Sequence, residues 1–312
     1  MTSALEVFGT RSLDVLSDEA TLAILLHLRE EPLTASQIEA SVDGIGYRVA
    51  LSRLRLLLLR GLVDLVAADG HHQRRVPHRL STSGRAILTV VDVAAACEAG
   101  WPRPPESFGP PGSTALGVSA DPAYRAIARA LAHDRLSAGD LERLLPDISH
   151  GTLLRRLRYC TALGLLRTEK EGRSAWLSLT DPARRLASVA MSAACWEWAF
   201  DDRDPGLMAS DLAGLIYQLA PLAHVDEDVN GIVKLHEDWP ITLQSDIYLA
   251  VGGGRMIPFV VGPLGPWDSV ASGTPQQWAE ALINGDPADI TSTGNRPLLE
   301  AVIASLNPEL HG

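Results

Sequence analysis

The sequence IGYRVALSRLRLLLLRG, at positions 45–61, returns in diverged form as ISHGTLLRRLRYCTALG at positions 148–164. The two copies lie 103 positions apart and align without a gap. Over the longer windows 33–63 and 136–166, ten of 31 positions are identical. A repeat of this length predicts that one supersecondary unit is built twice in the same chain.

Each copy predicts one amphipathic helix. Its apolar residues recur at i, i+4 and i+7, as Ala50, Leu54 and Leu57 do in the first copy, which is the spacing of a core-facing stripe. Gly61 and Gly164 predict the helix ends, because glycine takes the left-handed conformation that a helix end needs. The opposite face carries arginine and hydroxyl side chains, which fits either a solvated surface or a nucleic-acid contact.

The elements around each copy are repeated too. The order helix, helix, helix, two-stranded hairpin, helix is that of a winged helix-turn-helix. In the first unit we expect helices at 12–30, 34–42, 45–61 and 81–100, with hairpin strands at 62–66 and 73–80. We therefore predict an α+β chain with two tandem winged helix-turn-helix domains, mostly α with two-stranded wings, and a smaller α/β C-terminal domain. The expected boundaries are 1–100 and 121–202 for the winged domains, 101–120 for a partly extended Pro- and Gly-rich linker, and 203–312 for the C-terminal domain.

Charge is distributed unevenly along the chain. Net charge is −11 overall, but residues 1–100 carry −2, residues 101–200 carry +3 and residues 201–312 carry −12. Such asymmetry indicates that the parts have different roles. No run of about 18 or more uncharged apolar residues predicts a membrane span, and no signal peptide is evident, so we expect a cytoplasmic protein without a membrane partner.

The first repeat resembles the HxlR group of winged-helix transcription regulators. The residues that carry this likeness are LTASQIEASVDGIGYRVALSRLRLLLLRGLV at 33–63 and STSGRAIL at 81–88. The second repeat keeps LSAGDLERLLPDISHGTLLRRLR at 136–158 and LSLTDPARR at 177–185. The resemblance implies double-stranded DNA as a partner, and two units in one chain imply an intramolecular pseudo-dimer, in a monomer or a homodimer. The cysteine that the family tends to carry before its first helix is missing here, which argues against thiol sensing.

Residues 210–312 resemble the sterol carrier protein family. The likeness rests on strand-like stretches at 232–235, 247–251 and 257–261, followed by SGTPQQWAEALINGDPADITSTGNRPLLEAVIASL at 272–306. The resemblance implies a sheet with helices around an apolar tunnel, and hence an apolar small-molecule effector.

DNA contact requires side chains on the N-terminal half of a recognition helix, where arginine is the commonest guanine reader. The candidates on the two helices are Tyr47, Arg48, Ser52, Arg53, Arg55, Ser149, His150, Thr152, Arg155, Arg156 and Arg158. The wing tips offer Arg74, Arg75, Lys170 and Arg173 for phosphate contact. Arg53 and Arg156 could instead stabilise the fold through buried hydrogen bonds, and the whole set could be ordinary solvated arginine.

Aromatic side chains with few charges nearby suggest an apolar ligand pocket, although core packing explains them as well. The candidates are Trp196, Trp198, Trp239, Phe259, Trp267 and Trp278. The helix at 184–200 runs into the acidic domain, so we expect it to couple ligand and DNA. No catalytic motif is found, and we predict no enzyme, no cofactor and no metal.

Together these features predict a ligand-responsive, DNA-binding transcription regulator. The alternative is a non-DNA-binding accessory protein for a natural product, which uses the same fold to sequester or transform an apolar small molecule.

Overall fold

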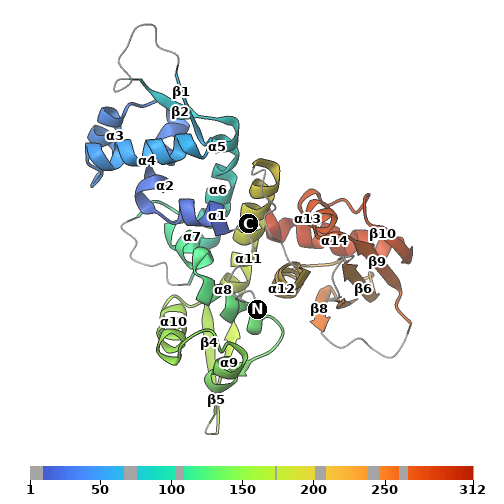
Figure 1. Ribbon diagram of the computed structural model, residues 1–312. Coiled ribbons are helices and arrows are strands. Elements are labelled where there is room, and N and C mark those ends of the chain that lie inside the picture. Colours follow the sequence, from blue (N-terminus) through green and yellow to red (C-terminus); the bar gives the residue numbers. More distant parts are fainter. Residues whose placement is uncertain are drawn as a thin grey trace.

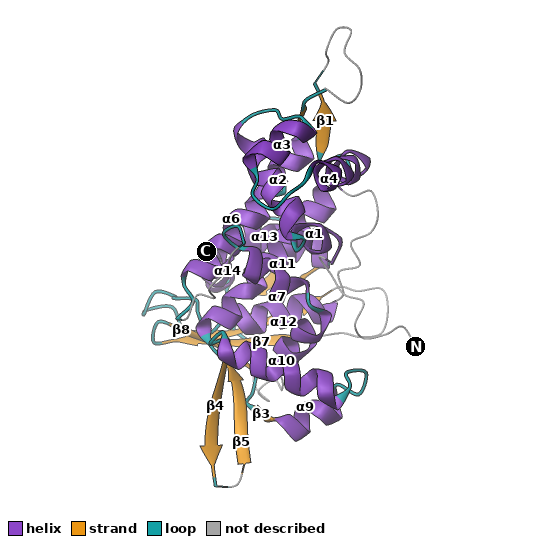
Figure 2. Cartoon of the chain, turned by 90° about the vertical axis from the view of Figure 1, so that its left-hand side faces the viewer, coloured by secondary structure: helices purple, strands orange, loops and turns teal. Residues whose placement is uncertain are grey.

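The structure is a computed structural model that describes residues 10–66, 76–102, 109–172, 174–200, 209–237, 246–259 and 266–311. It is a mixed α+β fold in which two related helical units share a core and a C-terminal sheet with its helices packs beside them. Figure 1 shows the hairpins of the two units at opposite ends of the molecule and the C-terminal part on the right. Figure 2 shows the same separation of the two hairpins from the side.

The first unit, residues 10–99, has the expected order of helices and hairpin. The helix expected at 12–30 is two helices, because Asp18 accepts a hydrogen bond from the Thr21 N–H and starts a new helix there. The expected helix at 81–100 is likewise divided at Ile87. The elements are α1 (Thr10–Leu16), α2 (Glu19–Glu30), α3 (Ala35–Ser41), α4 (Tyr47–Leu59), β1 (Val63–Leu65), β2 (His78–Leu80), α5 (Thr82–Ala86) and α6 (Leu88–Ala99).

The second unit, residues 113–200, begins earlier than we predicted. Residues 113–120, which we expected to belong to an extended linker, form a helix whose Ala115 and Leu116 are fully buried. Adding 103 to the bounds of α1 gives 113–119, so this helix is the repeat counterpart of α1. The elements are α7 (Ser113–Ala120), α8 (Pro122–Ala130), β3 (Leu136–Ser137), α9 (Ala138–Leu144), α10 (His150–Ala162), β4 (Leu166–Glu171), β5 (Ser174–Leu179) and α11 (Asp181–Phe200).

Local sequence explains where the repeated helices start and stop. Thr34 and Gln37 form a reciprocal capping box at the start of α3, and Ser137 and Asp140 do the same for α9. Gly61 and Gly164 follow α4 and α10 with φ of +69° and +76°, the left-handed conformation that stops each helix.

The two units are joined through their terminal helices. Helices α6 and α11 run antiparallel, since Cys97 lies 3.5 Å from Ser188 while Trp196 Nε1 donates to the Ser83 carbonyl at 2.9 Å. One core of buried apolar residues extends from Leu13 of α1 to Ala193 of α11. The units therefore form one packed body rather than two domains on a linker.

A reciprocal pair of glutamates reinforces this junction. In one direction, the backbone N–H and the hydroxyl of Ser12 in α1 both donate to Glu197 Oε1 in α11, at 2.8 Å each. In the other direction, the Ala115 N–H of α7 donates to Glu98 Oε2 of α6 at 3.2 Å. Because Ser12 and Ala115 occupy equivalent repeat positions, as do the two glutamates, the contact has approximate twofold symmetry.

The C-terminal part is a five-stranded sheet with helices on one face. The strand order is β10-β9-β6-β7-β8, with β6 and β9 parallel and the other neighbours antiparallel. Alternate strand residues such as Val233 and Leu249 are buried against the helices, together with Ala187, Met191 and Ala194 of α11. The elements are α12 (Ala209–Leu219), β6 (Gly231–Glu237), β7 (Ile247–Gly252), β8 (Arg255–Phe259), β9 (Ser269–Gly273), α13 (Pro275–Asn284), β10 (Thr291–Gly294) and α14 (Arg296–His311).

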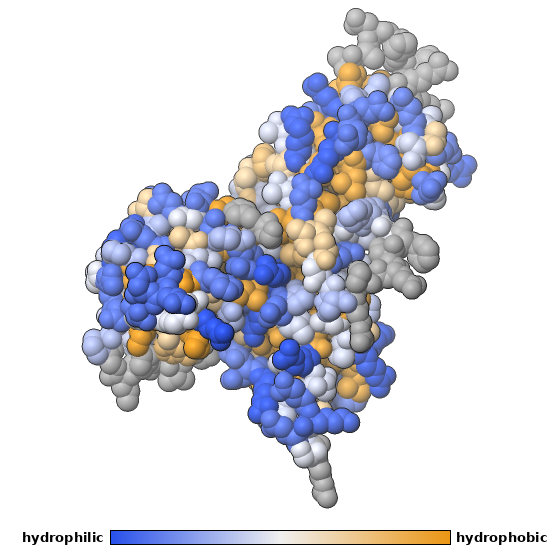
Figure 3. All heavy atoms as spheres, turned by 180° about the vertical axis from the view of Figure 1, so that it is seen from behind, coloured by the Kyte–Doolittle hydropathy of each residue, from blue (hydrophilic) through white to orange (hydrophobic). Residues whose placement is uncertain are grey.

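Among the described residues, no helix combines the length and the apolar character that crossing a bilayer would require. On the side shown in Figure 3, the surface of the C-terminal part is mostly hydrophilic, in keeping with its many acidic residues.

Candidate nucleic-acid interface and ligand cavities

Helices α4 and α10 expose corresponding arginines. Arg48 and Arg55 on α4, and Arg155 and Arg158 on α10, are solvent-exposed. Within the described parts of the chain, no ion pair or hydrogen bond of these four side chains is found. In Figure 1 both helices lie on the left and the C-terminal elements on the right, so the two helices are separated from the acidic part.

The other predicted contacts on these helices differ in exposure. Ser52, Ser149 and His150 are exposed, whereas Tyr47 and Thr152 are half-buried. The Ser149 hydroxyl caps α10 by accepting from the Thr152 N–H, so part of its hydrogen-bonding capacity is used within the chain.

Arg53 and Arg156 have a structural role. Arg53 pairs with Asp18 at 2.9 Å, and Arg156 pairs with Asp121 at 2.6 Å. Each aspartate is also the N-cap of the first long helix of its unit. These ion pairs match the bracing role left open by the sequence, and they remove both arginines from the candidate interface.

Two glutamates that sequence reasoning did not select lie at the starts of the same helices. The Tyr47 N–H donates to Glu39 Oε1 at 3.0 Å, and His150 Nδ1 lies 3.1 Å from Glu142 Oε1. A carboxylate is stabilised at this end of a helix by the helix dipole. Glu39 and Glu142 are among the identical repeat positions, and Asp18 and Asp121 lie 103 positions apart as well. Extending the repeat alignment upstream would have found the second pair.

The hairpin tips are described only in part. Lys170 is exposed on β4, whereas Arg74, Arg75 and Arg173 lie outside the described residues. Arg135 contacts Glu169 and Glu171 of the same hairpin and lies 5.3 Å from the centroid of the Trp176 ring. The described part of this hairpin is thus of mixed charge.

The predicted ligand-binding aromatics do not form one pocket. Phe259 and Trp267 flank Tyr248 on the sheet face opposite the helices, with ring centroids 5.8 and 5.1 Å from it. Trp278 is fully buried on the helical side, where its Nε1 donates to the His236 carbonyl. These two sets of aromatic side chains lie on opposite sides of the sheet, because successive side chains of a strand point to opposite faces. Trp198 is half-buried on α11, and Trp239 lies outside the described residues.

Trp196 lines an apolar cavity of about 230 Å³ between α6, α11 and α14. Its other walls include Val93, Met191, Phe200 and Leu310. The cavity therefore contacts the first unit, the last helix of the second unit and the C-terminal part at once. Burial raises the pKa of the Cys195 thiol in its wall to about 12, so this thiol is uncharged at neutral pH.

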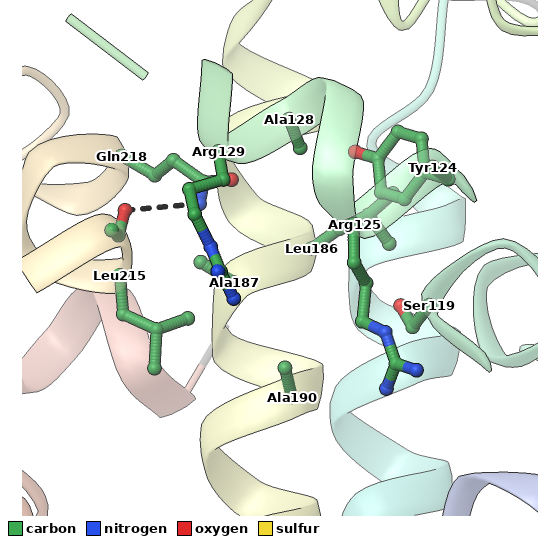
Figure 4. A pocket seen from close by; sticks show the side chains of 11 residues that line it. Ser119, Tyr124, Arg125, Ala128, Arg129, Leu186, Ala187, Ala190, Leu215 and Gln218 are labelled. Atoms are coloured by element: carbon green, nitrogen blue, oxygen red, sulfur yellow. Dashed lines mark hydrogen bonds between the residues drawn. The ribbon is translucent and has the colours of Figure 1, made fainter. Parts of the chain in front are cut away.

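A second cavity, of about 60 Å³, lies between α8, α11 and α12 and is shown in Figure 4. Arg125 and Arg129 project from α8, and Leu215 projects from α12 on the other side of the cavity. The Gln218 amide is held by a hydrogen bond to the Gly214 carbonyl at 3.0 Å. No carboxylate is found among the described residues that line this cavity.

A polar cluster lies on the outer face of the sheet. Asp246 accepts from Tyr248 and pairs with Lys234 at 2.9 Å and with His236 at 2.8 Å. Burial acts to raise the pKa of Asp246, but these hydrogen bonds outweigh it and the pKa is lowered. Over the described residues, no group of three or more His, Cys, Asp or Glu side chains is arranged to hold a metal ion.

No family model matches the chain, and no curated relative matches it. One solved structure, a double mutant of the sec-alkyl sulfatase PisA1, is 14% identical with a TM-score of 0.24. The match covers 94% of this chain but only 43% of that enzyme. It corrects one expectation, because we predicted that the chain is not an enzyme and the matched protein is one. At this TM-score no reaction and no residue role is carried over.

Proposed function

We propose that this protein is a DNA-binding transcription regulator of the HxlR type, with two winged helix-turn-helix units in one chain. In this proposal α4 and α10 are the recognition helices, which lie in the major groove. The observation that carries it is the pair of repeat-related arginines, Arg55 and Arg158, both exposed, on helices that lie on the opposite side of Figure 1 from the C-terminal elements. The neighbouring Arg53 and Arg156 form ion pairs with Asp18 and Asp121. Among the described residues, no such ion pair is found for Arg55 or Arg158.

The presence of two units in one chain predicts how the protein binds its operator. One chain presents both helices, so a single molecule is expected to contact successive major grooves about 34 Å apart. The half-sites should differ, because Tyr47 and Arg48 of the first helix correspond to His150 and Gly151 of the second.

Selection of binding sequences from a random duplex library, followed by footprinting, tests this proposal. We expect one protein molecule per site and two unlike half-sites one helical turn apart. A strictly palindromic footprint bound by two chains, or selection of no sequence at all, would contradict it.

We further propose that an apolar, uncharged effector binds in the cavity beside Trp196. The cavity of about 230 Å³ exceeds the ~150 Å³ that accommodates benzene in a protein core. The C-terminal part, in this proposal a sterol-carrier-like domain, supplies Ile283 and Leu310 to its wall. Effector binding can shift DNA affinity only through different affinities for the free and the DNA-bound conformations.

Energy transfer from tryptophan to dansylamide, an uncharged aromatic probe, tests the effector cavity. We expect saturable transfer that is reduced in Trp196→Phe and lost in Ala199→Phe, which places a ring at the cavity wall. Transfer that persists unchanged in both variants would place the apolar site elsewhere.

The accessory-protein alternative is favoured by one observation. Glu39 and Glu142 bring negative charge to the starts of both proposed recognition helices. If the library selection fails while the aromatic probe still binds, a role in sequestering or transforming an apolar compound becomes the better proposal.

A further inference from the structure

An apolar groove of about 480 Å³ lies between α10 and the β4–β5 hairpin of the second unit. It is lined in part by Leu157 and Ala162 of α10, by Ala175 and Leu177 of β5, and by Ala138 of α9. Its volume is about three times the ~150 Å³ that accommodates benzene in a protein core, and it lies within the roughly 300–1,000 Å³ of typical ligand pockets. The groove is therefore large enough for an organic molecule longer than a single ring.

The second unit carries smaller side chains beside this groove than the first unit does at the same repeat positions. Thr161 and Ala162, which both line the groove, correspond to Leu58 and Leu59 at the end of α4. Two leucine side chains are thus absent where α10 faces its hairpin, which leaves space there. Leu59 is 86% exposed, so this end of the helix tolerates a leucine without burying it.

Two cationic side chains flank the apolar floor of the groove. Arg158 of α10 lines it and is solvent-exposed. Lys170 of β4 is exposed as well and is the register partner of Ala175 on β5, so both lie on the side of the hairpin that faces the groove. Within the part of the chain that the structure describes, no ion pair or hydrogen bond of either cationic side chain is found.

The carboxylates of the hairpin lie on its other face. Glu169 and Glu171 alternate with Lys170 along β4, so they point away from the groove, and both contact Arg135. No carboxylate is found among the described residues that line the groove. The groove side of the hairpin is therefore apolar and basic, which complements a molecule with an apolar body and a negatively charged end.

We propose that this groove binds a free amphiphilic carboxylic acid, with an apolar chain and one terminal carboxylate. The chain lies over Leu157, Ala162 and Leu177, and the carboxylate pairs with Arg158 and Lys170. Arginine suits this contact because its planar guanidinium makes two parallel hydrogen bonds to one carboxylate. Affinity should rise with chain length, by up to about fourfold for each methylene group that the groove buries.

The site does not depend on the proposed function, because binding of the acid requires no DNA. One consequence does rest on that function. Arg158 is also a proposed DNA contact, so a bound acid and DNA compete for the same guanidinium. The test below is carried out without DNA, so its failure is distinguishable from a failure of the DNA-binding proposal.

Isothermal titration of the full chain tests the proposal with octanoate, below the concentration at which it forms micelles. Octan-1-ol, which has the same chain but no charge, and acetate, which has the charge but almost no chain, are the matched probes. We expect octanoate to bind about fivefold more tightly than octan-1-ol, as two exposed ion pairs allow, and acetate to bind far more weakly than either. The double variant Arg158→Gln/Lys170→Gln should lose the preference for octanoate and keep its affinity for octan-1-ol. Ala162→Leu, which fills the groove, should weaken both ligands at least fivefold.

Two control variants carry the same kinds of change outside the groove. Arg167→Gln alters an exposed arginine on the other face of β4, and Ala96→Leu adds a leucine at an exposed position of α6. Both should bind octanoate as the unmodified chain does. The proposal is overturned if octanoate does not bind below its micellar concentration, or binds no more tightly than octan-1-ol. It is also overturned if the double variant keeps the preference for octanoate, or if Ala162→Leu, folded by its unfolding curve, retains full affinity.

Discussion

Replacing Arg55 and Arg158 together by alanine is expected to abolish most specific DNA binding. Each arginine is exposed on its helix and makes no ion pair with the described residues. Loss of a base contact costs about 1–3 kcal/mol, so the double variant should lose about 2–6 kcal/mol. At about 1.4 kcal/mol per tenfold change, affinity for the selected site falls between roughly 30-fold and roughly 10⁴-fold. A gel shift at fixed salt measures this loss.

The single variants and a control make the result interpretable. Arg55→Ala and Arg158→Ala should each relax specificity in one half-site only, because each helix reads its own groove. Arg255→Ala, also at an exposed arginine but on β8 of the acidic part, should leave binding unchanged. If the double variant binds the selected site as tightly as the unmodified chain, the arginines are only solvated and the proposed interface is wrong.

Replacing Glu197 by alanine is expected to lower the free energy of unfolding by about 3 kcal/mol. Glu197 is 1% exposed, and its carboxylate accepts two hydrogen bonds from Ser12. Hydrogen bonds to a charged group contribute about 1.5–3 kcal/mol each, and the variant removes the acceptor that the two buried donors of Ser12 share. Some of the loss is recovered when the buried charge itself is removed, which keeps the expected effect below the simple sum. Urea unfolding followed by circular dichroism measures it.

Glu98 provides the matched control for this experiment. It occupies the equivalent position in the first unit, but it is only half-buried, and its bond from the Ala115 N–H is longer, at 3.2 Å. Glu98→Ala should therefore cost about 1 kcal/mol or less. Equal effects of the two variants would mean that burial of Glu197 does not strengthen the junction.

The features that sequence could predict are those fixed by neighbours along the chain. The capping boxes at Thr34 and Ser137 and the helix stops at Gly61 and Gly164 are local, so their positions follow from residue type and spacing. Helix α7 was missed because composition dominated the prediction. The stretch 101–120 is rich in proline and glycine, and the short apolar helix within it was recognisable only by comparison with α1.

The cavities could not be predicted, because each is formed by helices far apart in the sequence. Trp196 was chosen as an aromatic residue, but its cavity depends on how α6 and α14 pack on α11. The role of Arg53 was left open for a similar reason, since its partner Asp18 lies 35 residues away. The C-terminal part is also less independent of the second unit than its charge suggested. Its core includes Ala187 and Met191 of α11, which removal of residues 203–312 would expose to water.

The reciprocal exchange between α1 and α11, and between α7 and α6, has a consequence for how the protein responds to dilution. Two regulators that associate only as separate molecules lose their pairing when their concentration falls below the dissociation constant. Here each half carries the acceptor for the other's first helix, and the chain itself holds the halves at an effective concentration of the order of millimolar. Pairing is thus insensitive to how many copies a cell contains. Each half is also free to change its exposed residues alone, since no second copy must match it.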